Sequence, residues 1–280
     1  MIRRIGGVLI ARDPESAPEE SRQLQRAGFA VLPEVLAADE VMRLKASILD
    51  VFERYPPDRR APKPAEDEAH FRYELLNRSE AARACIANQR VLSVIEPLLG
   101  EDCHIIANTA WNNPPAPGSE GQAWHVDGGP HIPLPKGVRW PEELPRPVFA
   151  IGVHYLLKDV TLKDGPTWVI PGSHYSGRVP PYKRPFDMEL TDNGEAPVPL
   201  TAKAGDALLF VSDVWHRRGP SSESDQGRLF LQAHYARRDI AQRLHTTAHA
   251  HQLSEEAMTW ADEDRKRTLV GLHPPMFYDG

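Results

Sequence analysis

Residues 148–157 read VFAIGVHYLL, a run of apolar and small residues that only His154 interrupts. Such a short run is typical of a buried β-strand. Similar runs occur at residues 104–111, 167–172, 206–211 and 228–235, and Pro, Gly and Asp clusters separate them. This spacing predicts an antiparallel sandwich or barrel, so the expected fold class is mainly β.

The first hundred residues predict helices that flank the β-rich part. An extended piece at residues 28–32 precedes the first clear helix, which is expected from Asp39, its predicted N-cap, with apolar residues at helical spacing. Two more helices are expected, from Ser79, a predicted cap, through Ile86 and from Val91 to Leu99. A final helix is expected after Ser254, with acidic residues in its first turn and basic residues in its last.

The whole chain, residues 1–280, is expected to form a single domain. Its predicted parts are a helical segment at about 1–100, a β-rich core at about 101–238 and a C-terminal extension at 239–280. Within the core, residues 113–147 form a loop with nine prolines. Because long loops in compact domains are often functional and proline stiffens the chain, we expect this loop to be a lid or a substrate-facing wall.

Composition limits the classes of partner. The net charge of −6 is spread along the chain and argues against nucleic acid, and no apolar stretch is long enough to cross a membrane. The two cysteines, Cys85 and Cys103, are too few for a disulfide framework, which favours a reducing compartment. We therefore expect a cytoplasmic protein that binds neither nucleic acid nor a membrane. The oligomeric state has no signature in the sequence.

The sequence WHVDGG at residues 124–129 carries the strongest chemical signal. His125 and Asp127 lie two residues apart, so their side chains project to the same side of an extended backbone. His216, in the sequence DVWH, would supply a third ligand 89 residues after Asp127. Two histidines and one carboxylate form the ligand set of non-heme Fe(II) oxygenases, which leaves open positions for oxygen and a cosubstrate.

Arg228 opens the next β-type run, 12 positions after His216. A guanidinium group stays ionised and can bind a carboxylate through two parallel hydrogen bonds. An acidic cosubstrate is therefore its expected partner.

These sequences together resemble the phytanoyl-CoA dioxygenase family, over residues 28–238. The resemblance depends on GFAVLP at residues 28–33, WHVD, DGPTWVIPGSH at residues 164–174, AGDALLF followed by WH, and the spaced arginine. It implies a double-stranded β-helix, also called a jelly-roll or cupin-like fold. It also implies Fe(II), 2-oxoglutarate as cosubstrate and O2, with 2-oxoglutarate decarboxylated to succinate and CO2 while a substrate is oxidised.

The resemblance assigns roles to individual residues. It places the metal on His125, Asp127 and His216 and the distal carboxylate of 2-oxoglutarate on Arg228. Other positions that face the cosubstrate fall on Thr109, His154 and Arg72. Relatives often have an aromatic residue where His154 stands, so this side chain is either a cosubstrate contact or an interior histidine. Because Asp127 keeps the carboxylate ligand in place, hydroxylation is favoured over halogenation.

Trp111 and Asn113, just before the Pro-rich loop, are the candidate substrate-binding residues. Trp124, Trp168 and Trp215 are expected in the core, because each buries a large area. Other features are expected to be structural or solvated: the Ser–His turn at Pro171–His174, the paired Arg217 and Arg218, and the histidines His245, His249 and His251.

The predicted function is oxidation of a small metabolite, most simply its hydroxylation. One alternative is a cupin-like isomerase or hydrolase that uses the same three residues to hold a Lewis-acid metal. Arg228 argues against it, because such an enzyme needs no cosubstrate anchor. Another alternative is a non-catalytic sensor, which would be expected to lack a ligand. An acyl-CoA substrate would require a basic patch, for which the sequence offers only Arg59, Arg60 and Lys63.

Overall fold

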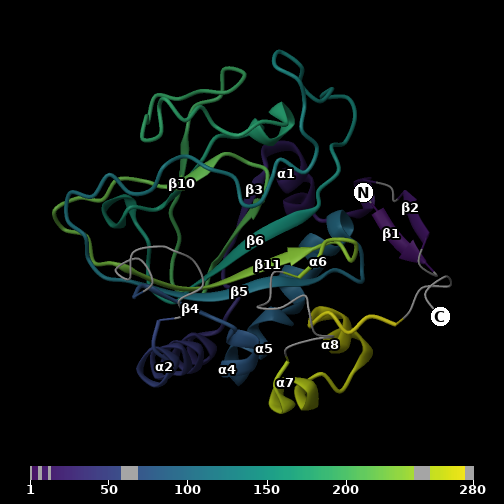
Figure 1. Cartoon of the computed structure of the whole chain (residues 1–280), viewed down its shortest axis with the longest axis vertical. Helices are drawn as coiled ribbons and strands as arrows, with labels where there is room; N and C mark the ends of the chain where they lie inside the picture. Colours follow the sequence, from purple (N-terminus) through teal and green to yellow (C-terminus); the bar gives the residue numbers. More distant parts are fainter. Residues whose placement is uncertain (1, 6–7, 12–13, 58–68, 243–252, 275–280) are drawn as a thin grey trace.

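Two antiparallel sheets form the β-rich part of the computed structural model, which describes residues 2–5, 8–11, 14–57, 69–242 and 253–274. In the larger sheet six strands lie in the order β3-β9-β6-β11-β5-β4 (Figure 1). These strands are β3 (Phe29–Leu32), β4 (Phe71–Tyr73), β5 (His104–Asn113), β6 (Ala150–Leu156), β9 (Ala207–Val211) and β11 (Arg228–Ala236).

The smaller sheet has the order β10-β7-β8 and lies across from the larger one (Figure 1). Its strands are β7 (Thr167–Val169), β8 (Val198–Leu200) and β10 (His216–Arg218). Apolar side chains from both sheets pack together between them, including Leu156, Val169, Leu200 and Phe210. Each of the five predicted runs contains a strand, and the two facing sheets form the predicted jelly-roll core.

Helices cover the opposite face of the larger sheet (Figure 1). They are α2 (Ala38–Arg54), α4 (Leu75–Arg78), α5 (Glu80–Ile86) and α6 (Gln89–Leu99). A continuous apolar core joins them to the sheet, with Ile48, Leu92, Val153 and Leu231 all fully buried. The remaining elements are β1 (Ile2–Ile5), β2 (Val8–Ala11), α1 (Glu19–Ala27), α7 (Glu255–Trp260), α8 (Asp264–Leu269) and the short 3-10 helices Pro14–Ser16, Leu162–Asp164 and Ser173–Ser176.

Side chains alternate between these two environments along the central strand β11, because successive residues of a strand point to opposite faces. One set of side chains joins the helix-side core: Leu229, Leu231, Ala233 and Tyr235. The other set faces the smaller sheet and lines a cavity there: Arg228, Phe230, Gln232 and His234. We call these the core face and the pocket face of the larger sheet.

Several predicted helix ends were correct and others were wrong. Ser79 caps α5 by accepting a hydrogen bond from the Ala82 backbone. Helix α2 begins before Asp39, because the Glu40 side chain accepts from the Ala37 backbone and so closes the first turn. The predicted single C-terminal helix is two short helices, α7 and α8, so that residues on both can pack against the core.

Five elements of the N-terminal part were not predicted: the strands β1, β2 and β4 and the helices α1 and α4. β4 is only three residues long, too short for a periodicity to be detected in the sequence. In the described part of the chain, no helix combines the length and the apolar character needed to cross a bilayer.

The Pro-rich loop is fixed to the segment that precedes His216. Asp213 accepts hydrogen bonds from the His131 backbone at 3.1 Å and from Arg146 Nη2 at 2.7 Å, and it also pairs with the His131 ring. Arg146 is only 1% exposed. Buried ion pairs of this kind are costly to separate, which favours a fixed wall over a lid.

Candidate metal and cosubstrate site

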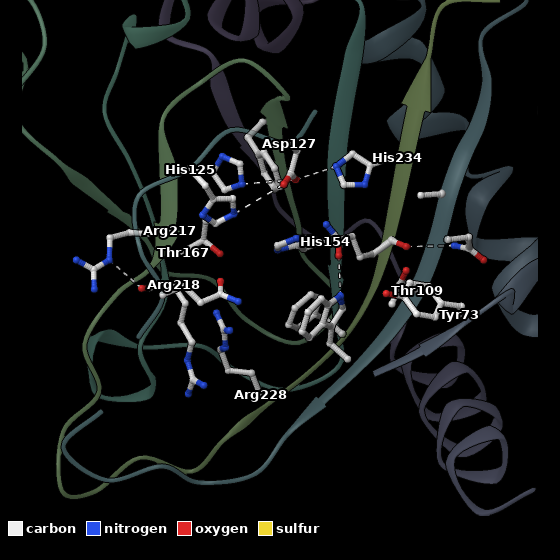
Figure 2. Close-up of a pocket in the computed structure, with 18 of the residues that line it drawn as sticks. Tyr73, Thr109, His125, Asp127, His154, Thr167, Arg217, Arg218, Arg228 and His234 are labelled. Carbon is white, nitrogen blue, oxygen red and sulfur yellow. Dashed lines mark hydrogen bonds and ion pairs between the residues drawn. The ribbon is translucent and has the colours of Figure 1, made fainter. Parts of the chain in front are cut away.

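A cavity of about 550 Å³ opens between the two sheets. Its walls come from the pocket face of the larger sheet, from β10 and from the Pro-rich loop (Figure 2). Among the side chains that line it are Tyr73, Thr109, Trp111, His125, Asp127, His154, His216, Arg217, Arg218, Arg228, Gln232 and His234.

The three predicted metal ligands converge at one end of this cavity. Ligand atoms of His125, Asp127 and His216 all lie within 4.8 Å of one another. The His125 Nε2 atom is 3.7 Å from Asp127 Oδ1, and the His216 Nε2 atom is 3.5 Å from Asp127 Oδ2. Such spacing allows one ion to contact all three.

The backbone explains how residues so distant in sequence meet. His125 and His216 form an antiparallel bridge, with backbone N–H···O distances of 2.9 Å and 3.0 Å. The Asp127 backbone N–H donates to the Ser212 carbonyl at 2.9 Å. These bonds place the Pro-rich loop beside the start of β10, where all three side chains can face the cavity.

The imidazole rings are oriented for metal binding. The Nδ1–H of His125 donates to the Ala123 carbonyl at 2.8 Å, and that of His216 donates to the Val214 carbonyl at 2.9 Å. Each ring therefore carries its proton on Nδ1 and has its Nε2 lone pair free to bind a metal, as is usual for ligating histidines. The donor set of two imidazoles and one carboxylate fits Fe(II).

Protonation states fit the same role. Burial and the neighbouring His216 lower the pKa of His125 to about 4, so this ring is neutral at pH 7. Burial alone would raise the pKa of Asp127, but His216 and His234 outweigh it and hold the pKa well below its usual value. Asp127 is therefore a carboxylate. It raises the pKa of His216 in turn, although burial of that ring acts in the opposite direction.

Arg228 lies on the pocket face of β11 and is 6% exposed. Burial and the nearby Arg218 lower its pKa to about 9, so the guanidinium is still charged at pH 7. Its Nη2 donates weakly to Asn113 Oδ1 at 3.4 Å, and its Nε has no hydrogen-bond partner among the described residues. A buried cation with so few partners is prepared to bind an anion.

His154 lies between the ligand group and Arg228 (Figure 2). Its ring packs against Phe210 and Phe230, with centroid distances of 5.0 Å and 4.5 Å. Burial and Arg228 lower its pKa well below the usual value, so the imidazole is neutral. Within the described residues the structure shows no hydrogen bond to this ring. An interior histidine with a purely structural role would be expected to have hydrogen-bond partners for its nitrogens, so this observation favours a contact with the cosubstrate.

The other candidate residues take different positions. Thr109 and Trp111 line the cavity from β5, and Trp111 Nε1 donates to Gln232 Oε1 at 2.6 Å. Asn113 contacts Arg228 and is not among the lining residues. Arg72 lies on the core face of β4, where its Nε donates to the Tyr55 carbonyl at 2.7 Å. Arg72 is therefore not among the residues that line the cavity.

Arg217 and Arg218 were expected to be exposed, and this expectation was wrong. They form part of β10, and Arg217 is 1% exposed with its guanidinium near the rings of Trp124 and Phe186. Arg218 Nη2 contacts the buried Asp225 at 3.4 Å. Their position directly after the candidate ligand His216 places them in the cavity wall.

Several structural expectations are borne out by contacts. Trp124 and Trp215 are buried in one cluster, and Trp168 packs against it. Ser173 and His174 form a turn, in which Ser173 Oγ accepts from the Trp215 backbone and His174 Nε2 donates to the Gln25 carbonyl. Two sets of predicted residues lie outside the described part of the chain: His245, His249 and His251, and the basic Arg59, Arg60 and Lys63.

His234 lines the cavity but was not predicted from the sequence. Its Nε2 donates to Asp127 Oδ2 at 3.0 Å, and it is 5% exposed. A signal was present: His234 lies six positions after Arg228, and the period of two along a strand puts both on one face.

Comparison with known proteins identifies the family. A family model described as phytanoyl-CoA dioxygenase (PhyH) matches residues 24–229, a range that includes the three candidate ligands and Arg228. Dioxygenase af480 of Aspergillus fumigatus is 28% identical over 176 residues, which are 62% of this chain and 50% of that protein. The chain therefore spans half the length of this relative. Ectoine dioxygenase of Sphingopyxis alaskensis is 27% identical over 76% of this chain and 74% of that protein.

Solved structures agree on the fold. EctD from S. alaskensis, in its apoform, has a TM-score of 0.61 at 22% identity and covers 88% of this chain and 94% of that one. The epimerase SnoN, solved with Fe3+, alpha ketoglutarate and nogalamycin RO, has a TM-score of 0.60 at 18% identity and covers 87% of this chain and 94% of that one. The predicted jelly-roll fold is thereby confirmed. The family match also confirms the predicted enzyme class, an iron dioxygenase that uses 2-oxoglutarate and O2. The chain belongs to the phytanoyl-CoA dioxygenase family.

Proposed function

We propose that the protein oxidises a small-molecule metabolite, most simply by hydroxylation, with decarboxylation of 2-oxoglutarate to succinate and CO2. In this proposal His125, Asp127 and His216 hold Fe(II), and Arg228 binds the distal carboxylate of 2-oxoglutarate. One observation carries the proposal: the ligand group and the buried arginine line the same cavity. When bound, Fe(II) supplies the activation of O2 that the oxidation requires.

The remaining residues of the cavity bind and orient the cosubstrate. The charged Arg228 has an Nε without a hydrogen-bond partner in the described part of the chain, from which a carboxylate can accept, and Asn113 contacts one of its amino groups. The neutral His154 lies close by and has an N–H to donate to the same anion. Phe210 and Phe230 flank this ring and exclude water, which strengthens each charge-assisted hydrogen bond.

The substrate is proposed to bind where the cavity reaches β4 and β5. Tyr73 and Trp111 line that side, together with Gln232 of β11. Thr109 is proposed to face the cosubstrate, as the resemblance implies. The total volume of about 550 Å³ lies within the roughly 300–1,000 Å³ usual for small-molecule sites. It suits a small metabolite bound beside the cosubstrate. We place the reaction in the reducing cytoplasm, since Cys85 and Cys103 are both free and buried.

The two alternatives receive less support. A Lewis-acid isomerase would have no use for a buried, charged arginine in the cavity whose Nε has no hydrogen-bond partner among the residues that the structure describes. A non-catalytic sensor is disfavoured because all three ligand positions are filled and converge.

Succinate formation tests the proposal without knowledge of the substrate. We would supply metal-free protein with Fe(II), ascorbate and 2-oxoglutarate under air, for the wild type, Asp127→Ala, Arg228→Ala and Arg26→Ala. Arg26 is exposed and does not line the cavity, so its variant is the control. We expect succinate from the wild type and the control and little from the other two. Absence of succinate, combined with no charge-transfer absorbance on anaerobic addition of Fe(II) and 2-oxoglutarate, would overturn the proposal.

A further inference from the structure

Besides the candidate ligands His125 and His216, a further histidine, His234, lies beside Asp127. His234 Nε2 lies 3.0 Å from Asp127 Oδ2, closer than the nearest nitrogen of His125 or His216 lies to this carboxylate (Figure 2). The carboxylate accepts, so the imidazole must carry its proton on Nε2. His234 comes from β11, the central strand of the larger sheet, and is 5% exposed.

The neighbouring strand leaves room for this contact. Gly152 of β6 pairs with His234 across the sheet. A Cβ atom at Gly152 would come within 3.0 Å of His234 Nε2 and within 2.7 Å of the Phe210 ring. The backbone here does not require glycine for its conformation, since no positive φ occurs at this residue. Glycine is needed for space, and the space is occupied by the imidazole that reaches Asp127.

From this geometry we propose that His234 is a positioning residue for the metal site. Its Nε2–H fixes the orientation of the Asp127 carboxylate by donating a hydrogen bond to Oδ2. A carboxylate held in this way would meet the ion without first having to be ordered. The inference rests on the proposed function, because it assumes that Asp127 is a ligand.

Fe(II) affinity is the first measurement, because it does not depend on turnover. We would titrate Fe(II) anaerobically into metal-free wild type, His234→Leu and His234→Gln. Loss of an outer-shell partner commonly weakens metal binding by about 10–100-fold, and we expect that range for His234→Leu. His234→Gln, whose amide can donate to the same oxygen, should recover most of the affinity.

Two further variants separate this role from a general effect on packing. Gly152→Ala keeps His234 but pushes its ring and that of Phe210, so we expect Fe(II) affinity to fall here as well. His104→Leu removes another buried histidine of the same sheet, which contacts the Ile240 carbonyl and His273 away from the cavity. This control should bind Fe(II) like the wild type. Unfolding curves of the metal-free variants show whether each one is folded.

The outcomes distinguish the two proposals. If wild type gives the Fe(II)–2-oxoglutarate charge-transfer band and His234→Leu binds Fe(II) as tightly as wild type, the positioning role is overturned and the proposed function stands. Equal losses in His234→Leu and His234→Gln, with Gly152→Ala unaffected, also overturn it. If wild type itself fails to bind Fe(II), both proposals fail.

Discussion

The two faces of the larger sheet are built from the same strands but differ in chemistry. On the core face, side chains such as Val153 and Leu231 are apolar and fully buried against the helices. On the pocket face, His154, Arg228 and His234 are nearly as buried, yet they are ionisable. Burying such groups costs free energy unless they gain partners. The difference indicates that the core face stabilises the protein, whereas the pocket face is selected for ligands at the expense of stability.

Among substitutions that test this difference between the two faces, Arg228→Leu is expected to have the largest effect. Arg228→Leu should weaken 2-oxoglutarate binding by about 2–5 kcal/mol, at least about thirtyfold, because a buried charged partner is lost. The free energy of unfolding without ligand should stay the same or rise. Calorimetric titration of 2-oxoglutarate under anaerobic conditions with Fe(II), beside urea unfolding, measures both. The exposed Arg26→Leu is the control. A marked loss of ligand-free stability would contradict the contrast.

Leu231, three residues along the same strand, should behave in the opposite way. Leu231→Ala leaves a cavity in the helix-side core and should lower the free energy of unfolding by about 2–5 kcal/mol. Affinity for 2-oxoglutarate should be nearly unchanged in the folded variant. The adjacent pocket-face variant Gln232→Ala is the matched comparison. If it lowered the free energy of unfolding more than Leu231→Ala, the proposed difference between the two faces would be contradicted.

A third test uses a buried histidine outside both faces. Burial lowers the pKa of His174 to about 4, so below pH 6.5 the unfolded chain binds a proton that the folded chain does not. The free energy of unfolding that the neutral His174 contributes at pH 7 should therefore be lost as the pH falls from 6.5 towards 4. Between pH 7.5 and 5, His174 should account for a loss of about 2 kcal/mol.

Urea unfolding of metal-free wild type and His174→Gln at the two pH values isolates this contribution. Glutamine can keep the donor to the Gln25 carbonyl but does not titrate. We expect a smaller loss at pH 5 for the variant. Identical pH dependence in the two proteins would mean that His174 is protonated as easily in the fold as outside it.

The smallest effects are expected from substitutions at two neighbouring residues of β6, His154 and Tyr155. His154→Phe should pack between Phe210 and Phe230 and stabilise the ligand-free protein by about 1 kcal/mol, a rise in Tm of roughly 2–4 °C. Tyr155→Phe, on the core face, removes a hydroxyl that lies 2.8 Å from Tyr235 and should destabilise by about 1 kcal/mol. Thermal unfolding measures both, and a lower Tm in His154→Phe would show that the histidine is already well accommodated.

The sequence was informative where a pattern repeats over several residues. Runs of apolar residues located five strands, and the HxD spacing in an extended segment located two candidate ligands, whose ligand atoms lie within 4.8 Å of that of His216. What it could not show was the pairing of segments distant along the chain. The resemblance placed Arg72 at the cosubstrate, but the pairing of β4 with β5 puts its side chain on the core face. Arg217 was expected to be solvated, but it is buried, with its guanidinium near the rings of Trp124 and Phe186. The contact of His234 with Asp127 likewise depends on strand order.

The positions of β3 and β4 have a consequence for biosynthesis. These two strands come from the N-terminal part of the chain, yet they form the two outer edges of the larger sheet. Its inner strand β11 ends at Ala236 and would be made long after them. The strand β3 pairs with β9, which lies far along the chain, so β3 has no partner for most of synthesis, whereas β4 pairs with the nearer β5. Such long-range pairing is slow. We therefore expect the sheet to close only after synthesis of the core is complete, a stage at which unpaired edges would be exposed to chaperones.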